Sequence, residues 1–550
     1  MGGHGAPRSC RNHQGEELVG LPCLGFASIR LFRMKTSFLT FCLSFFLPAW
    51  ACADWPQWRG ANRDGSSAAS LSLADSWPEA GPKLLWESEP IPSGDDGGFS
   101  SPVVADGLVY LSLVWHRDVP TKTRTVDDLA MRKIGARRVN LPEELIAVME
   151  KARLSLSPRL RGTKLDEWAK AWVEENLDAK QRLLYADFVI SRFRKGKFAF
   201  PIDATNKLFS IRNKTFPSEK AFLAWIDEQG FDDETRTRII DGVPPTRKVA
   251  DDAIVALDLQ NGATRWKSSL EGIPTGRVSS STPCVSGGRV FAVGSNRIFC
   301  IEAKTGKLVW DVPIDSKGAA SSALVEDGKV VALVGRLTAF DAASGQTLWT
   351  SKDLSGNRAS PVVWMPGKRK MIVCNSSRSV VGVDLETGDT LWEAPSGGSS
   401  TPVAAGQYLI VHAKDEKVGL AAYRWNGVGV ELAWKIPKLT RRSDSSPLVK
   451  DGQVYLFGAG MQACYDLDTG RKRWKEVASQ DISSPVLADD RILSYEIKAS
   501  FLRMVKADPE QAVTLGRAKL QALRCSSPAI VGDKLLIRTH KGIACYYLGK

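Results

Sequence analysis

The sequence contains few of the residues and spacings that most often carry out chemistry. It has 5 histidines and 10 cysteines in 550 residues, and no two cysteines are adjacent or arranged as Cys-x-x-Cys. Without that spacing, or a His-x-x-x-His or His-Glu pair, no zinc site is indicated. No Gly-x-Ser-x-Gly, Walker or dinucleotide-binding fingerprint lies between a strand and a helix. We therefore expect no catalytic residues and no metal ligands.

Long hydrophobic runs are also missing. The one apolar run near the N-terminus, Phe38–Leu47, is too short to span a membrane. Arg33 and Lys35 precede it, and Ala51-Cys52-Ala53 follows it with the small-x-small pattern of signal-peptide cleavage. Residues 1–53 are thus predicted to be a signal-peptide region, with Met34 as a candidate true start. Cleavage before Asp54 would give an exported protein, periplasmic or extracellular, without a transmembrane segment; lipidation at Cys52 is the alternative.

The chain also has no dense basic block. Its 74 basic and 61 acidic residues give a formal net charge of +13, but the excess is spread along the sequence. A nucleic-acid binder would show clustered cations interleaved with aromatic residues. We expect no nucleic-acid partner.

The sequence does have a repeat of about 40 residues. Two small residues followed by proline, or once by alanine, open eight copies, which begin at Ser100, Ser281, Ser321, Ala359, Ser400, Ser445, Ser483 and Ser526. Most copies continue with small-x-Asp-x-x-Thr-Gly-x-x-x-Trp, clearest at Gly382–Trp392. Asp-Gly and Thr-Gly turns predict hairpins. Each copy therefore reads as four short strands, which is typical of a propeller blade.

The two ends of the repeat region complement each other. The eighth copy stops after its third strand, Ile543–Tyr547, whereas Leu84–Trp86 is a fourth strand with no three before it. We predict that this strand completes the last blade, because an open ring would leave unpaired edges. The predicted fold is an all-β, eight-bladed β-propeller of four-stranded blades over residues 84–116 and 251–550, after an N-terminal extension at 54–83.

The repeated element resembles the PQQ-like (quinoprotein-type) propeller family over the same residues. Asp54–Gly65 is similar to the start of secreted bacterial members. The resemblance implies two kinds of function. Some members are alcohol dehydrogenases that bind PQQ with calcium, use an aspartate base and often carry a disulfide between adjacent cysteines. Others are non-enzymatic scaffolds, such as the propeller lipoprotein of outer-membrane assembly.

This sequence departs from the dehydrogenases because it has no adjacent cysteine pair. We therefore expect a non-catalytic binding or assembly scaffold that acts through its channel face and a helical insert. A divergent PQQ-dependent alcohol or sugar dehydrogenase is the alternative, and an anionic-polysaccharide binder is the third hypothesis. No cofactor is assigned; PQQ with calcium is the one that the resemblance would allow.

The repeated residues have structural interpretations. One acidic residue per copy, just before a turn, suits hydrogen bonding to the turn backbone, as at Asp258, Glu302, Asp341, Asp384 and Asp466. The repeated tryptophans are predicted to pack blade against blade. Cys300, Cys464 and Cys545 share a position that alanine or glycine fills in other copies, so cysteine serves there as a small hydrophobic residue.

A cation precedes the first strand in five copies. We call the set of these residues the cationic collar: Arg277, Lys317, Arg358, Arg442 and Arg524. The loops that carry them open around the channel of a propeller. Arginine matches carboxylate or sulfate groups, so an anionic ligand or an acidic surface of a partner protein is the predicted occupant. The alternative is solvated loop charge.

Residues 117–250, between the second and third strands of the first copy, have a different character. Leu165, Trp168 and Trp172 share one helical face, and Pro217 opens a further short helix that ends near Gly230. The segment has 27 Lys and Arg against 20 Asp and Glu. We predict a helical insertion in blade one that emerges on the collar face as a cap or partner-binding module. The oligomeric state stays open.

Overall fold

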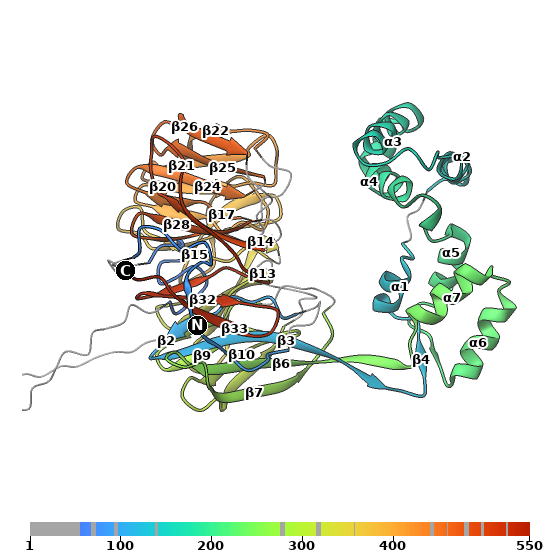
Figure 1. The fold of residues 1–550 in the computed structure, drawn as a ribbon, viewed down its shortest axis with the longest axis horizontal. Helices are drawn as coiled ribbons and strands as arrows, with labels where there is room; N and C mark the ends of the chain where they lie inside the picture. Colours follow the sequence, from blue (N-terminus) through green and yellow to red (C-terminus); the bar gives the residue numbers. More distant parts are fainter. Residues whose placement is uncertain are drawn as a thin grey trace, which may run out of the picture. The chain divides into compact units, whose positions relative to one another are not determined.

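The computed structural model describes the greater part of the chain after residue 54 (Figure 1). The described ranges are 55–67, 73–92, 97–137, 141–275, 281–314, 321–356, 358–439, 445–458, 460–477, 483–496, 500–523 and 526–550. The predicted signal region lies outside these residues. No helix in the described ranges combines the length and the apolar character that crossing a bilayer requires.

Apart from the helices between residues 120 and 246, the described residues form an all-β fold of antiparallel sheets. Sheet one joins β2 (Val103–Ala105), β3 (Leu108–Pro120), β6 (Thr246–Asp258) and β7 (Thr264–Gly272). Sheet two joins β8 (Cys284–Ser286), β9 (Arg289–Val293), β10 (Arg297–Glu302) and β11 (Leu308–Pro313). Sheet three has β12 (Leu324–Glu326), β13 (Lys329–Asp341) and β14 (Thr347–Gly356). Sheet four has β15 (Val362–Trp364), β16 (Met371–Asn375), β17 (Ser379–Asp384) and β18 (Thr390–Pro395).

The remaining sheets repeat this pattern. Sheet five has β19 (Val403–Ala405), β20 (Tyr408–His412), β21 (Leu420–Trp425) and β22 (Val430–Ile436). Sheet six has β23 (Leu448–Lys450), β24 (Gln453–Gly458), β25 (Met461–Asp466) and β26 (Lys472–Val477). Sheet seven has β27 (Val486–Ala488), β28 (Arg491–Glu496), β29 (Phe501–Lys506) and β30 (Val513–Lys519). Sheet eight has β31 (Ala529–Val531), β32 (Lys534–Arg538), β33 (Ile543–Tyr547) and β1 (Lys83–Glu87).

Local sequence explains the hairpins between first and second strands. Asp106 and Gly107 both have positive φ, 50° and 75°, as do Asp327 and Gly328 at 45° and 73°. Two successive positive values suit a tight turn between antiparallel strands, and Asp-Gly accepts them readily. The turns that were predicted from Asp-Gly are thereby confirmed.

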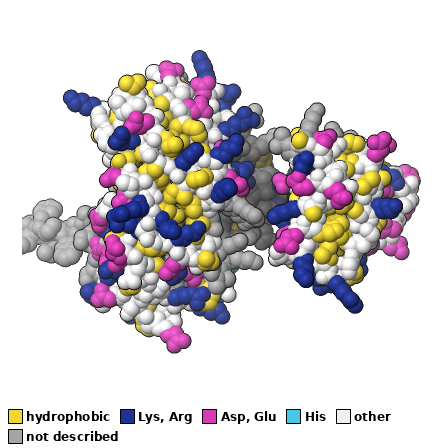
Figure 2. Space-filling model, turned by 90° about the horizontal axis from the view of Figure 1, so that it is seen from above, with side chains coloured by type: hydrophobic (Ala, Val, Ile, Leu, Met, Phe, Trp, Pro, Cys, Tyr) yellow, Lys and Arg dark blue, Asp and Glu magenta, His cyan; other side chains and the backbone are white. Residues whose placement is uncertain are grey.

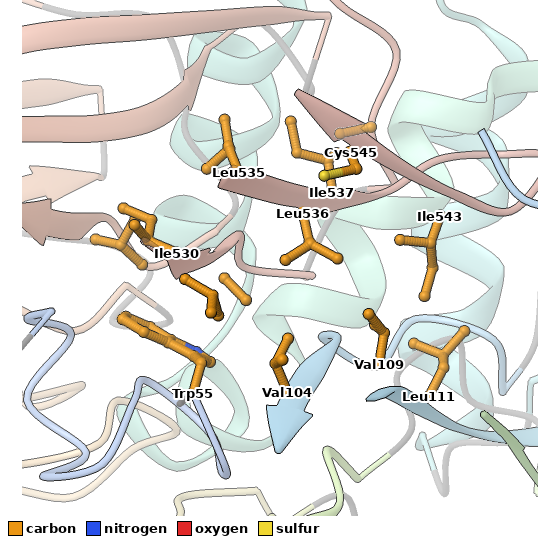
Figure 3. Close-up of a cluster of buried hydrophobic side chains, with 14 of the residues drawn as sticks. Trp55, Val104, Val109, Leu111, Ile530, Leu535, Leu536, Ile537, Ile543 and Cys545 are labelled. Carbon is orange, nitrogen blue, oxygen red and sulfur yellow. The ribbon is translucent and has the colours of Figure 1, made fainter. Parts of the chain in front are cut away.

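Sheet eight combines the two ends of the repeat region. β1 pairs antiparallel with β33, and Trp86 lies opposite Cys545. Figure 3 shows the neighbouring core, where Val104, Val109 and Leu111 face side chains of β31, β32 and β33. The strand that was expected to complete the last repeat therefore does so. First strands of successive sheets also contact one another, including β2 with β8 and β2 with β31. The architecture is of the propeller type.

The helices of the described residues lie between β3 and β6 in the sequence. They are α1 (Asp128–Ile134), α2 (Glu143–Leu154), α3 (Thr163–Asn176), α4 (Ala179–Lys195), η1 (Gly196–Phe198), α5 (Ile202–Ser210), α6 (Glu219–Glu228) and α7 (Asp233–Gly242). Two short strands, β4 (Arg124–Thr125) and β5 (Thr215–Phe216), pair beside them. Side chains of Asp127, Asp178, Ser218 and Asp232 accept hydrogen bonds from the first turns of their helices, which fixes where these helices begin.

The helical region has two apolar clusters. One includes Met131, Phe200 and Phe222, and the other includes Met149, Trp172 and Phe193. Trp168 and Trp172 both pack edge-on against Phe193, at 5.0 and 4.9 Å between ring centroids. The predicted apolar face of this helix therefore belongs to the core of the region itself.

A long ladder joins the helical region to sheet one. β3 and β6 pair without interruption from Leu108 opposite Asp258 to Pro120 opposite Thr246. β2 covers β3 only as far as Tyr110, and β7 covers β6 only back to Ala250. The last pairs therefore form a two-stranded ribbon (Figure 1). Beyond it, the amide of Thr121 donates to Pro245 O at 3.0 Å.

Candidate functional site

The structure describes one member of the cationic collar. Arg277, Lys317, Arg442 and Arg524 lie outside the described residues, so the collar as a set stays a prediction. Arg358 is exposed and lines a hollow of about 360 Å³ together with Lys414, Asn375, Ser377 and Ser399. Within the described residues, neither Arg358 nor Lys414 has an ion-pair partner. Their charges are therefore available to a ligand.

The wall of this hollow is held by internal hydrogen bonds. The side-chain Nδ2 of the buried Asn375 donates to Ser400 O at 2.8 Å, and Ser396 Oγ donates to Asn375 Oδ1 at 2.9 Å. Ser376 Oγ accepts from the amides of Arg378 and Ser379 at 3.1 and 2.9 Å. A fixed polar wall with two unpaired cations is an arrangement that binds an anionic group.

The repeated acidic residues fix turns, as predicted. Asp258 Oδ1 accepts from the amides of Gln260 and Asn261 at 2.9 and 3.2 Å, and Asp384 Oδ1 accepts from Glu386 at 2.8 Å. The Arg265 guanidinium beside Asp258, helped by the turn amides, holds the pKa of that carboxyl below its usual value. These carboxylates are already hydrogen-bonded, and no group of three metal-ligating side chains occurs in the described ranges.

The repeated tryptophans connect neighbouring sheets. In six cases the indole Nε1 donates at 2.7–3.1 Å to a carbonyl of the next sheet's last turn: Trp86 to Leu259, Trp266 to Ala303, Trp310 to Ala342, Trp349 to Leu385, Trp434 to Leu467 and Trp474 to Asp508. In five of the six, all but Trp474, the ring also lies on the glycine of that turn. A Cβ at Gly388 would stand 2.4 Å from Trp349 Cε3. This contact explains why Thr-Gly and Trp recur together, and it confirms the packing role.

The serines and threonines that open the repeats have a role that sequence reasoning missed. The second residue of one opening donates its amide to the hydroxyl of the second residue of the next. Six such bonds of 2.8–3.1 Å run from Ser101 to Thr282, Thr282 to Ser322, Ser322 to Ser360, Thr401 to Ser446, Ser446 to Ser484 and Ser527 to Ser101. These residues are buried. The repeated hydroxyl was the signal that should have predicted this ring of hydrogen bonds.

The space inside this ring is occupied by the chain itself. Residues 55–67, the axial segment, contact the first strands or their openings in seven sheets. Trp55 forms an antiparallel bridge with Val104 of β2, and Pro56 O accepts from Val285 of β8 at 2.8 Å. At the other end, Leu487 of β27 donates to Gly65 O at 2.8 Å. Its place was not predicted from the sequence.

Two arginines of the axial segment are buried against backbone carbonyls. Arg59 and Arg63 are each 1% exposed. Arg59 donates to Ser446 O and Pro447 O in sheet six, at 3.1 and 2.6 Å. Arg63 donates to Ser322 O and Ala323 O beside sheet three and to Pro361 O beside sheet four. Burial lowers the pKa of both groups to about 10, so both remain protonated at neutral pH.

The described cysteines and histidines fit structural roles. Cys284, Cys300, Cys374, Cys464 and Cys545 are buried and not disulfide-bonded. Burial raises the pKa of Cys284 to about 11 and that of Cys300 to about 12. The buried His412 bonds Ser445 O through Nδ1 at 2.9 Å. Cys525 lies outside the described residues.

The described residues do not fit PQQ and calcium at the axis. Calcium requires several oxygen ligands, usually including carboxylates. The axial segment brings two guanidinium groups there and one carboxyl, Asp64, whose pKa is raised by burial. Six of the surrounding serine and threonine hydroxyls accept hydrogen bonds from backbone amides, whereas Ser527 Oγ has no hydrogen-bond partner among the described residues. We derive no quinone-dependent step.

Comparisons with known proteins identify relatives of this chain. A family model described as outer membrane protein assembly factor BamB matches residues 250–456 and 430–549. Curated proteins of that description match from Yersinia pestis, 25% identical over 32% of this chain, and Burkholderia pseudomallei, 22% identical over 53%. The chain spans 49% of the Yersinia protein's length and 78% of the Burkholderia protein's.

A solved structure, BamB from Moraxella catarrhalis, aligns with a TM-score of 0.45 and 17% identity, covering 54% of this chain and 89% of its own. The family model covers more than half of the 550 residues, over the sheets that carry the tryptophan and hydroxyl contacts. The chain belongs to the PQQ-like repeat propeller family that this BamB model describes.

Proposed function

We propose that the protein is an exported, non-catalytic binding or assembly scaffold. The observation that carries the proposal is the filled axis. The axial segment occupies the space between the first strands, and buried Arg59 and Arg63 take up the carbonyls there. Since that space is used for internal contacts, binding to other molecules falls to the outer surfaces.

In this proposal the architecture is an eight-bladed propeller with a helical insertion in blade one. Eight sheets succeed one another in the described residues, and β1 joins the last of them. The domain limits remain those expected from the sequence: 54–83, 84–116 with 251–550, and 117–250. The insertion follows β3, in the same kind of connection, second to third strand, as Lys414 of sheet five.

The proposed binding surfaces are the channel face and the insertion. Arg358 and Lys414 supply positive charge on the channel face, beside the openings of sheets four and five. Figure 2 shows that basic side chains elsewhere are interspersed with acidic ones, so no continuous basic patch covers the visible face. An acidic surface of a partner protein is the occupant that we propose.

The relatives' name suggests the setting. Proteins named outer membrane protein assembly factor share the repeat with this chain. We propose that this chain likewise assists assembly of envelope proteins, after export directed by residues 1–53. The partner would contact the insertion, the Arg358 hollow or both.

A complementation experiment tests the proposal. The gene is deleted from its native bacterium, and the abundance of outer-membrane β-barrel proteins is measured by quantitative proteomics. The full chain should restore the wild-type levels. A chain whose residues 122–244 are replaced by a two-residue hairpin should fold but fail to restore them, because Thr121 and Pro245 are already hydrogen-bonded neighbours.

Two further variants make the test sharper. The pair Arg358→Ala and Lys414→Ala should reduce complementation, whereas Arg369→Ala, which breaks an exposed ion pair with Asp384, serves as the matched surface control. Calorimetric titration of the chain from Asp54 with PQQ, with and without calcium, tests the enzyme alternative. Calcium-dependent one-to-one binding would overturn the scaffold proposal, as would full complementation without the insertion.

A further inference from the structure

We propose that the centre of the sheets is an arginine-selective peptide-binding site and that the axial segment is its ligand, carried on the same chain. The ligand class is a peptide that folds into consecutive turns and has the pattern Trp-x-x-Trp-Arg-x-x-x-Arg, which residues 55–63 provide. The proposal does not depend on the identity of any outside partner. It assigns a binding role to residues that the family model leaves unmatched, since that model starts at residue 250.

The receptor side of this site consists of backbone carbonyls. Outside the axial segment, the acceptors for Arg59 and Arg63 are carbonyls of Ser322, Ala323, Pro361, Ser446 and Pro447, all shortly before a first strand; within the segment, Arg59 also donates to Asp64 O at 2.6 Å. Because these openings recur in each sheet, their carbonyls gather around the axis. Clustered carbonyl oxygens form a partially negative site with no acidic side chain, and a guanidinium satisfies several of them at fixed angles.

Lysine would fit this receptor poorly. The Arg63 guanidinium reaches carbonyls beside two different sheets and also donates Nε to Gln57 Oε1 at 3.0 Å. An ammonium group is a compact point charge that lacks the planar fork and remote Nε donor. The contacts of Arg63 therefore select the shape of the side chain as well as its charge.

The backbone conformation of the axial segment also indicates that its contacts hold it in one conformation. Arg59 and Arg63 adopt φ of 62° and 60°, a region that side chains other than glycine rarely occupy. Such strain persists only where the surroundings fix it, and here the guanidinium contacts do so. Gly65 has φ of 88°, and a Cβ there would lie 2.6 Å from Arg59 Nη2. The glycine therefore leaves room for the arginine to bind.

The segment is anchored along its length by independent contacts. Trp55 and Val104 exchange backbone hydrogen bonds of 3.0 and 2.8 Å. Trp58 Nε1 donates to Thr401 Oγ1 at 3.0 Å in the opening of sheet five. The amide of Ser67 donates to Leu487 O at 2.8 Å. Because the anchors lie in sheets one, five and seven, binding of the segment holds distant sheets in register.

The test separates the segment from the rest of the chain. A protease site replaces residues 68–72 in the mature protein, which is cut after folding and then unfolded in urea. Its own cut segment is removed, and the remaining chain is refolded with an excess of four peptides of residues 54–67 in equal amounts. They are the unchanged peptide, Arg63→Lys, Arg59→Lys, and Ala61→Ser as the matched control at an exposed position. Native mass spectrometry reports which peptide each refolded molecule holds.

We expect one peptide per molecule, with unchanged and Ala61→Ser peptides incorporated equally. Each lysine peptide should be incorporated about 10-fold less or lower, since losing one charge-assisted hydrogen bond reduces affinity by about that factor. Equal incorporation of the lysine peptides would overturn arginine selectivity. A refolded protein without peptide but with an unchanged melting temperature would overturn the site itself.

A second measurement uses the uncut chain in case refolding fails. Arg63→Lys should lower the melting temperature and speed hydrogen exchange in β12 and β15, the strands that follow its carbonyl acceptors. Ala61→Ser should change neither. If the two variants match the wild type in both measurements, the proposal is wrong.

Discussion

Replacing Trp86 by alanine perturbs the contact that joins the N-terminal strand to two sheets. Trp86 belongs to β1 in sheet eight, is 8% exposed, and donates Nε1 to Leu259 O in sheet one at 3.0 Å. Its ring lies on Gly262, where a Cβ would be 2.3 Å from Cε3. Truncating a buried tryptophan to alanine destabilises a protein by about 3–5 kcal/mol. About 1 kcal/mol of that comes from the indole hydrogen bond.

The assay compares Trp86→Ala with Trp349→Ala. Trp349 makes the same contact, to Leu385 O at 3.0 Å and above Gly388, but between sheets three and four. Both variants should lose similar stability in urea unfolding. Only Trp86→Ala should speed hydrogen exchange in β33, because only that variant loosens β1 from its paired strand. Trp86→Phe, which keeps an aromatic ring without the donor, should fall between the wild type and alanine.

The reasoning would be refuted by either of two results. A loss below about 1 kcal/mol for Trp86→Ala would mean that the indole is not docked as described. Equal exchange of β33 in both alanine variants would mean that β1 does not close sheet eight.

Three other predictions concern single contacts. Gly388→Ala should destabilise by about 2–3 kcal/mol more than Gly406→Ala in urea unfolding, because both have positive φ but only Gly388 has a ring within 4 Å. Cys284 and Cys300, with pKa raised by burial to about 11 and 12, should not react with a thiol reagent at pH 8 until the chain unfolds. Burial raises the pKa of Glu150, but hydrogen bonds from Arg192 and Arg153 outweigh it and hold the pKa below the usual 4.5. That stabilisation is present above pH 4.5 and lost as pH falls through the lower folded pKa. The free energies of unfolding of the Glu150→Gln and wild-type full chains should therefore converge at acidic pH. Urea unfolding followed by tryptophan fluorescence measures them.

The repeated features of the fold were predictable because each is reported several times in the sequence. The Thr-Gly turn and the tryptophan that follows it recur, so the strands, the turn-fixing aspartates and the packing tryptophans could all be placed. The strand at Leu84–Trp86 has no three strands of a copy before it, and the eighth copy stops after its third strand. Together these two features predicted the pairing of β1 with β33. Here the local pattern and the tertiary contact agree, as minimally frustrated sequences require.

Features that occur once were not predictable in this way. The axial segment has no second copy, and Arg59 and Arg63 do not recur with the repeat. Their acceptors are main-chain oxygens, and every residue has one, so the sequence does not mark which of them bind the arginines. The ribbon of β3 and β6 likewise pairs residues more than a hundred positions apart, so no hairpin signal marks it. The hydroxyl ring was visible as repeated serine and threonine, but a small-residue requirement explained the same pattern.

The N-terminal part of the chain contributes both to the centre and to the outer edge of the fold. The axial segment joins first strands, and β1, fewer than twenty residues further on, joins the outer side of sheet eight. Pairing Trp86 with Cys545 closes a loop about ten times longer than one repeat. Loop-closure entropy grows only with the logarithm of length, so this costs about 2 kcal/mol more than closing one repeat. Docking of Trp86, at about 3–5 kcal/mol, exceeds that cost without help from the axial segment. The pairing of β1 with β33 therefore does not require the buried arginines. The lysine peptides thus measure a separate property, the selectivity of the carbonyls of particular sheets for arginine.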